Sequence, residues 1–112
     1  MLFRSCRDYR RIGSKKFNHC YVHLERDAEG MATASLRHAV NGRVIEVTMD
    51  RSFSAIVVYT GDAIADAPRR ACAIEPMTCA SDAFNHPEWG LKRLLPGEPF
   101  TGRYTIRHRT GT

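Results

Sequence analysis

The chain has 112 residues, 43% hydrophobic and 26% charged, which is the composition of one folded domain rather than of a disordered segment. The formal net charge is +5, but residues 1–16 hold six of the 17 basic residues and one of the 12 acidic ones. Residues 17–112 are therefore neutral overall, whereas a nucleic-acid-binding domain carries its basic patch on a folded face. We interpret residues 1–16 as a solvated basic arm leading into the first strand, and expect no binding to nucleic acid.

The first half of the chain predicts strands. Residues 17–25 are rich in aromatic and β-branched side chains, which favour a strand. Residues 31–49 surround Asn41-Gly42, a dipeptide typical of the turn between two antiparallel strands, and apolar and polar residues alternate over 43–49. We therefore predict a β-hairpin over residues 31–49.

The middle of the chain predicts two buried strands separated by a loop. Residues 55–60 form an apolar run whose length suits a strand buried on both faces. After a loop over 61–70, residues 71–75 predict a second buried strand. We expect that strand to stop at Pro76, because proline has no backbone N–H to donate to a neighbouring strand.

The last third of the chain predicts a long loop and a final pair of strands. Residues 77–90 indicate a loop with one turn of helix near residues 82–85. Two strands, over 91–95 and 100–108, are expected to flank the turn Pro96-Gly97-Glu98, and alternation in the second predicts one solvated face. Six or seven strands without a convincing helix predict an all-β antiparallel β-sandwich. Because such folds often need about 200–250 residues as one unit, we expect an incomplete half of one.

Four cysteines are present, at positions 6, 20, 72 and 79, without a C-x-x-C pair or histidines at zinc-finger spacing. We therefore predict no metal and no cofactor. The chain shows no apolar signal-peptide core and no apolar run long enough to cross a membrane. These observations lead us to expect a cytoplasmic protein with reduced thiols and no membrane partner.

Several short sequence motifs occur together in the second half of the chain. An apolar strand ends in Tyr59-Thr60-Gly61-Asp62, residues 73–85 read A-I-E-P-M-T-C-A-S-D-A-F-N, and Pro96-Gly97-Glu98 forms a turn. With F-N-H-C-Y at residues 17–21, they resemble the C-terminal part of the aldose 1-epimerase (galactose mutarotase) family. The resemblance implies a galactose mutarotase-like β-sandwich, of which residues 17–112 are the C-terminal part. It also implies an isomerase that interconverts the α and β anomers of an aldohexose.

Glu75 is the main candidate for chemistry. A carboxylate in an apolar strand is unusual because its desolvation is costly, and the residues alone leave open a structural ion pair with Arg69 or Arg70. The resemblance implies instead that Glu75 is the catalytic base, which removes the proton of the anomeric hydroxyl while an acid protonates the ring oxygen.

Asn18 is the second candidate, and we expect it to line one concave polar site together with Glu75. The resemblance implies that position 18 binds sugar hydroxyls, although the family has aspartate there, and an amide can still donate and accept. His19 is expected on the opposite side of a regular strand. Val57 stands where related proteins often have a sugar-binding glutamine.

The family's acid histidine, a second histidine and a sugar-binding arginine come from an N-terminal half that has no counterpart in these residues. We therefore expect a truncated member of the family that is weak or inactive alone and self-associates through an exposed sheet edge. The alternatives are a non-catalytic carbohydrate-binding or interaction remnant, and an unrelated β-domain with a basic arm.

Overall fold

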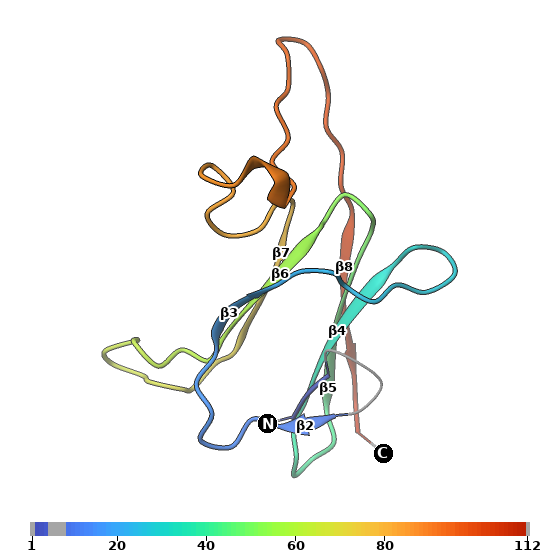
Figure 1. Ribbon diagram of the computed structural model, residues 1–112. Coiled ribbons are helices and arrows are strands. Elements are labelled where there is room, and N and C mark those ends of the chain that lie inside the picture. Colours follow the sequence, from blue (N-terminus) through green and yellow to red (C-terminus); the bar gives the residue numbers. More distant parts are fainter. Residues whose placement is uncertain (1, 5–8, 112) are drawn as a thin grey trace.

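The structure is a computed structural model in which residues 2–4 and 9–111 are described. It contains two antiparallel sheets, one with strand order β2-β1-β4-β5-β8 and one with order β3-β6-β7 (Figure 1). The strands are β1 (Leu2–Arg4), β2 (Arg10–Arg11), β3 (Asn18–Tyr21), β4 (Ala32–Arg37), β5 (Val44–Met49), β6 (Ala55–Tyr59), β7 (Ala73–Met77) and β8 (Tyr104–Arg109). In this part of the chain the only helix is a single 3-10 turn, η1 (Pro87–Trp89). The predicted all-β antiparallel architecture is confirmed, and the two small sheets are consistent with an incomplete β-sandwich.

The predicted hairpin over residues 31–49 is confirmed as β4 and β5, which pair from Ala32↔Met49 to Arg37↔Val44. The loop of this hairpin is longer than a two-residue turn. The hydrogen bond that closes it runs from the backbone N–H of His38 to the carbonyl of Arg43 at 2.8 Å, and the loop lies between these two residues. The basic head contributes β1 and β2 to the same sheet, with β1 paired to β4. The division of the chain at residue 16 stays a prediction.

The three-stranded sheet has β6 at its centre and β3 and β7 at its edges. The prediction that the second strand stops at Pro76 is wrong, since β7 runs through Pro76, which lies opposite Ile56. An edge strand tolerates proline because half of its N–H groups face away from the neighbouring strand. The strand predicted over 17–25 forms only over Asn18–Tyr21.

The C-terminal third departs most from the sequence predictions. No strand forms over 91–95, and the segment 91–103 extends beyond the ends of both sheets before β8 begins (Figure 1). The last strand was expected to have one solvated face, but all six residues of β8 are exposed, so both of its faces are solvated. β8 pairs only with β5, and no described element covers it. A hydrogen-bonded turn forms near 82–85 as predicted, since the N–H groups of Asn85 and His86 donate to the carbonyl of Asp82 at 3.0 and 3.1 Å, and the 3-10 turn η1 follows it over Pro87–Trp89.

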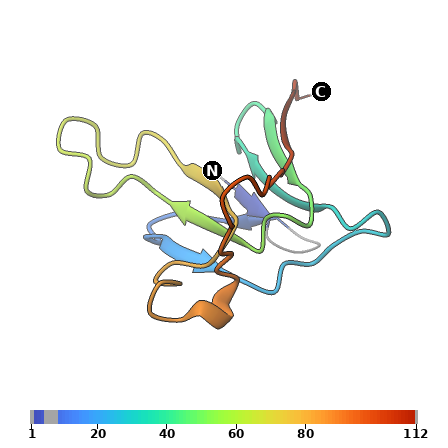
Figure 2. The same ribbon diagram turned by 90° about the horizontal axis from the view of Figure 1, so that it is seen from above.

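The hydrophobic core lies between the two sheets, which diverge when seen from above (Figure 2). The hairpin contributes Ala34, Val47 and Met49, and β6 contributes Ile56 and Val58. Met49 and Val58 are 1% and 0% exposed. Burial of a side chain of this size stabilises a fold by about 1.5–3 kcal/mol. Ile56 and Val58 of β6 therefore face the core, whereas Val57 and Tyr59, which are only partly buried, face away from it.

Candidate functional site

The candidate site lies on the face of the three-stranded sheet that points away from the core, which we call the outward face. Successive side chains of a strand point to opposite faces, so Val57 and Tyr59 lie on this face because Ile56 and Val58 are buried. The register places Cys20 and Glu75 on either side of Val57, and Asn18 beside Tyr59. Glu75 and Asn18, the two predicted site residues, thus share the outward face.

Both residues are exposed, so they lie on an open surface. Asn18 is two strands away from Glu75 and two residues further along the sheet. With strands 4.7–4.9 Å apart and a rise near 3.3 Å per residue, their Cα atoms are about 12 Å apart. This distance suits a ligand that lies across Val57 and Tyr59, not a direct contact between the two side chains.

Glu75 forms no ion pair with any residue that the structure describes. Arg69, one of the two arginines suggested by the sequence, is instead paired with Asp62, with Nη1 and Oδ1 2.6 Å apart. The exposure of Glu75 also removes the desolvation cost that the apolar sequence around it suggested. Its carboxylate is available to accept a hydrogen bond from a ligand hydroxyl.

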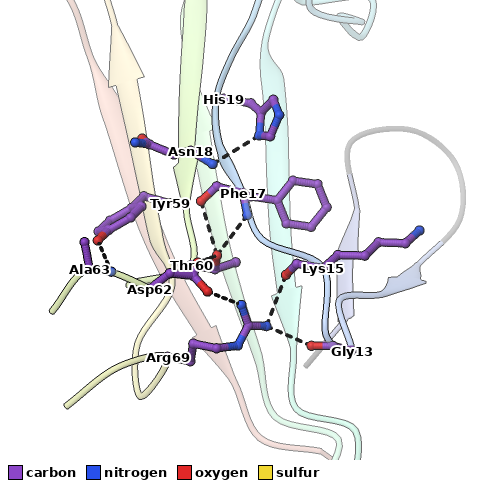
Figure 3. Close-up of polar contacts among 10 residues, drawn as sticks. All are labelled: Gly13, Lys15, Phe17, Asn18, His19, Tyr59, Thr60, Asp62, Ala63 and Arg69. Atoms are coloured by element: carbon purple, nitrogen blue, oxygen red, sulfur yellow. Dashed lines mark hydrogen bonds and ion pairs between the residues drawn. The ribbon is translucent and has the colours of Figure 1, made fainter. Parts of the chain in front are cut away.

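A polar network at the start of β3 and the end of β6 holds one end of the outward face (Figure 3). The N–H of Thr60 donates to the carbonyl of Phe17, and the N–H of Phe17 donates to Oγ1 of Thr60, both at 2.9 Å. Arg69 donates from Nη2 to the carbonyls of Gly13 at 2.8 Å and Lys15 at 3.1 Å. These bonds join the segment before β3 to the loop after β6, and so keep Asn18 opposite Tyr59.

Asp62 is the acidic centre of this network. The Thr60 hydroxyl donates to its carboxylate, and this bond, followed by the hydrogen bond and charge of Arg69, lowers the pKa of Asp62. Gly61, between Thr60 and Asp62, has φ 70°, which glycine adopts without strain. A Cβ there would lie 3.1 Å from the carbonyl oxygen of Ala71. The phrase Tyr59-Thr60-Gly61-Asp62 therefore marks a tight, hydrogen-bonded turn beside the candidate site.

Tyr59 and Cys20 are residues of the outward face that the sequence analysis did not select. The hydroxyl of Tyr59 accepts a hydrogen bond from the N–H of Ala63 at 2.9 Å, which leaves its own proton free for a ligand (Figure 3). Alternation along β6 groups Tyr59 with Val57, but the strand sequence alone does not show which group faces the core. His19 lies opposite Val58 and so on the other side of β3 from Asn18, as expected.

Residues 9–111 contain no group of three or more His, Cys, Asp or Glu side chains placed to hold a metal ion. In the same part of the chain, no helix has the length and apolar character needed to cross a bilayer.

The fold and the site define an antiparallel β-protein whose candidate site is an open sheet face. The family model described as aldose 1-epimerase matches residues 3–107. The chain therefore belongs to the aldose 1-epimerase family, which confirms the resemblance drawn from its phrases. No curated protein and no solved structure matches it. Family membership indicates an aldose epimerase-like function and, in general terms, a sugar substrate.

Proposed function

We propose that this chain is an aldose 1-epimerase-type isomerase that interconverts the α and β anomers of a hexose. Glu75 is the base, and Asn18 binds sugar hydroxyls. The observation that carries the proposal is the register of β3, β6 and β7, which brings these two residues to one exposed sheet face. The match to the aldose 1-epimerase family supports the same assignment.

The reaction needs one base and one acid. The Glu75 carboxylate takes the proton of the anomeric hydroxyl, a carbonyl forms at the anomeric carbon, and the bond to the ring oxygen breaks as that oxygen is protonated. Rotation of the carbonyl carbon and ring closure from its other side give the second anomer. A positioned general base contributes about 10²–10⁴-fold to such a rate.

The strand residues of the outward face include no histidine to serve as the acid. They are Asn18, Cys20, Ala55, Val57, Tyr59, Ala73, Glu75 and Met77. Protonation of the ring oxygen then falls to solvent or to a group outside these strands. We therefore expect anomer exchange by this chain to be slow, and to depend on any acid that is added.

Asn18 and Val57 set how a sugar is held. The amide of Asn18 accepts from one hydroxyl and donates to another oxygen, so position 18 can bind a sugar without a charge. Val57 lies between Cys20 and Glu75, where it offers an apolar contact but no side-chain hydrogen bond. Binding on this face thus depends on its edge strands.

A non-catalytic carbohydrate-binding protein is the second candidate function. The same observation favours it, since a face with one carboxylate, one amide and no histidine can hold a sugar without opening its ring. The two candidates differ in whether Glu75 affects a rate or only an affinity.

Proton NMR of anomer exchange distinguishes them. Exchange of freshly dissolved α-galactose is followed in buffer, with the protein, and with Glu75→Gln, which keeps the shape of the side chain and removes the base. Glu29→Gln is the matched control, because Glu29 is exposed and lies in the loop before β4. Imidazole is then added as an external acid, with protein-free imidazole as the reference.

We expect a small rate above buffer that rises with imidazole, is lost in Glu75→Gln and is kept in Glu29→Gln. Equal rates for the native chain and Glu75→Gln, where both exceed buffer, would show that Glu75 is not the base. Galactose binding that weakens in Asn18→Ala, without any exchange above buffer, would favour the second candidate.

A further inference from the structure

Strand β8 leaves one side of its backbone open in the part of the chain that the structure describes. It lies at the edge of the five-stranded sheet and pairs only with β5. The N–H of Asp50 donates to the carbonyl of Arg103 at 3.0 Å, so the main chain of Arg103 points toward β5. Because this direction alternates along an antiparallel strand, every second residue of β8 turns its N–H and C=O groups to the open edge. These residues are Tyr104, Ile106 and His108.

The side chains of these three residues lie on the side of the sheet that carries the core. Ile106 is paired with Val47 and Tyr104 with Met49, and both partners belong to the buried core cluster. Ile106 and Tyr104 are nevertheless 66% and 53% exposed. The open edge therefore has an apolar side that no described element covers.

The opposite side of β8 is basic. It carries Thr105, Arg107 and Arg109, and Arg103 continues the same row immediately before the strand. Arg109 is paired with Glu46, with Nη2 and Oε2 2.8 Å apart. Among the described residues, Arg103 and Arg107 form no ion pair. Acidic side chains on a strand added at this edge would therefore meet two cations that have no carboxylate of their own.

We propose that the open edge of β8 binds an extended acidic segment of a partner protein, which adds to the sheet as an antiparallel strand. Only another strand matches the alternating donors and acceptors of an open sheet edge. The side chains of the segment alternate between acidic residues, which face Arg107, and apolar residues, which face Ile106. The partner is thus defined by a pattern of charge and hydropathy as well as by its extended backbone.

A second copy of the chain fits this edge less well than an acidic segment. Antiparallel pairing of two β8 strands centred on Ile106 sets Arg103 of each copy opposite Arg109 of the other. Like charges directly opposite each other destabilise a sheet. Copies of the chain should therefore pair weakly, and an acidic strand should compete with them for the edge.

NMR titration tests the proposal with three short peptides that have blocked ends. The first alternates glutamate and valine, and the second alternates lysine and valine. The third is the glutamate peptide with N-methylated valines, the residues whose N–H groups would face β8, so it keeps its charges and loses those hydrogen bonds. We expect the glutamate peptide to bind, the other two to bind at least about tenfold more weakly, and added salt to weaken binding.

Variants of β8 test the basic side of the edge. Arg107→Glu should weaken binding of the glutamate peptide about three- to tenfold, whereas Arg107→Lys should keep most of it. Arg70→Glu is the matched control and should change nothing, because Arg70 is exposed in the loop between β6 and β7 of the other sheet.

Amide hydrogen exchange locates the bound peptide. Exchange at Tyr104, Ile106 and His108 should slow when the glutamate peptide binds, because only their N–H groups gain a partner. Equal binding of the plain and N-methylated peptides, or equal binding by the native chain and Arg107→Glu, would overturn the proposal. Protection of these three amides by a higher protein concentration alone, with no effect of the peptide, would identify a second copy as the occupant and also overturn it.

Discussion

Glu75 and Asn18 reach solvent only if the opposite face of β6 packs against the core. Substitution of two adjacent valines of β6 tests which face is buried. Val58 is 0% exposed and belongs to the core cluster, whereas Val57 is half-buried on the outward face beside Glu75. Each is replaced by alanine. Because both lie in the central strand, the loss of β-propensity is shared, and the difference between the two variants reports the burial of each side chain.

The magnitudes follow from the groups removed. Valine to alanine deletes two carbon groups, worth about 0.8 kcal/mol each when fully buried. The incompletely relaxed cavity adds to this value, so Val58→Ala should lower the free energy of unfolding by about 2–3 kcal/mol. Val57→Ala removes the same groups from a half-buried site and should cost about 0.5–1 kcal/mol. The first loss is a large share of a total of roughly 5–15 kcal/mol.

Urea unfolding followed by Trp89 fluorescence measures both variants. With a slope of about 1–3 kcal/mol per molar urea, Val58→Ala should lower the midpoint by about 1–2 M and Val57→Ala by about 0.5 M. The slope itself should not change, because neither variant alters the surface exposed on unfolding. A loss for Val57→Ala that equals or exceeds the loss for Val58→Ala would refute the reasoning, since Glu75 and Asn18 would then face the core.

Three further predictions concern the site, the turn and the sheet edge. Asn18→Asp should give anomer exchange equal to or faster than that of the native chain in the imidazole assay, and a slower rate would contradict the expectation that a carboxylate at position 18 holds the sugar at least as well as the amide. Because the pKa of Asp62 is lowered in the folded state, its ionised carboxylate stabilises the fold at pH values above the unfolded-state pKa of about 3.9. This stabilisation is lost as the pH falls through the folded-state pKa. The urea midpoint of Asp62→Asn should therefore be lower than that of the native chain at pH 7, and it should change less with pH below about pH 4. Midpoints that fall equally with pH in both proteins would contradict this linkage. Because β8 is an exposed edge strand with Ile106 66% exposed, sedimentation velocity should show association that grows with concentration and weakens in Ile106→Lys; a native monomer at every concentration would exclude edge pairing.

Local sequence determined the elements that need only neighbouring residues. The Asn41-Gly42 turn and the alternation after it predicted the hairpin, and the apolar run over 55–60 predicted the strand that became β6. The loop over 61–70 followed from its glycine and proline. The phrases around Tyr59 and Glu75 were sufficient to indicate the family. Each of these features depends on residues close together in the chain.

Only the tertiary structure decided which side chains face the core and which face solvent. Glu75 is exposed in spite of its apolar neighbours because its pairing with Val57 puts it on the outward face, and the place of β7 at the edge of its sheet lets the strand run through Pro76. Tyr59 and Cys20 join Asn18 on one face through the register of β3 with β6, which pairs residues about 40 positions apart. The sequence carries the alternation of each strand, but burial of Ile56 and Val58 against the hairpin selects which half of that alternation forms the core and which half is left to bind a sugar.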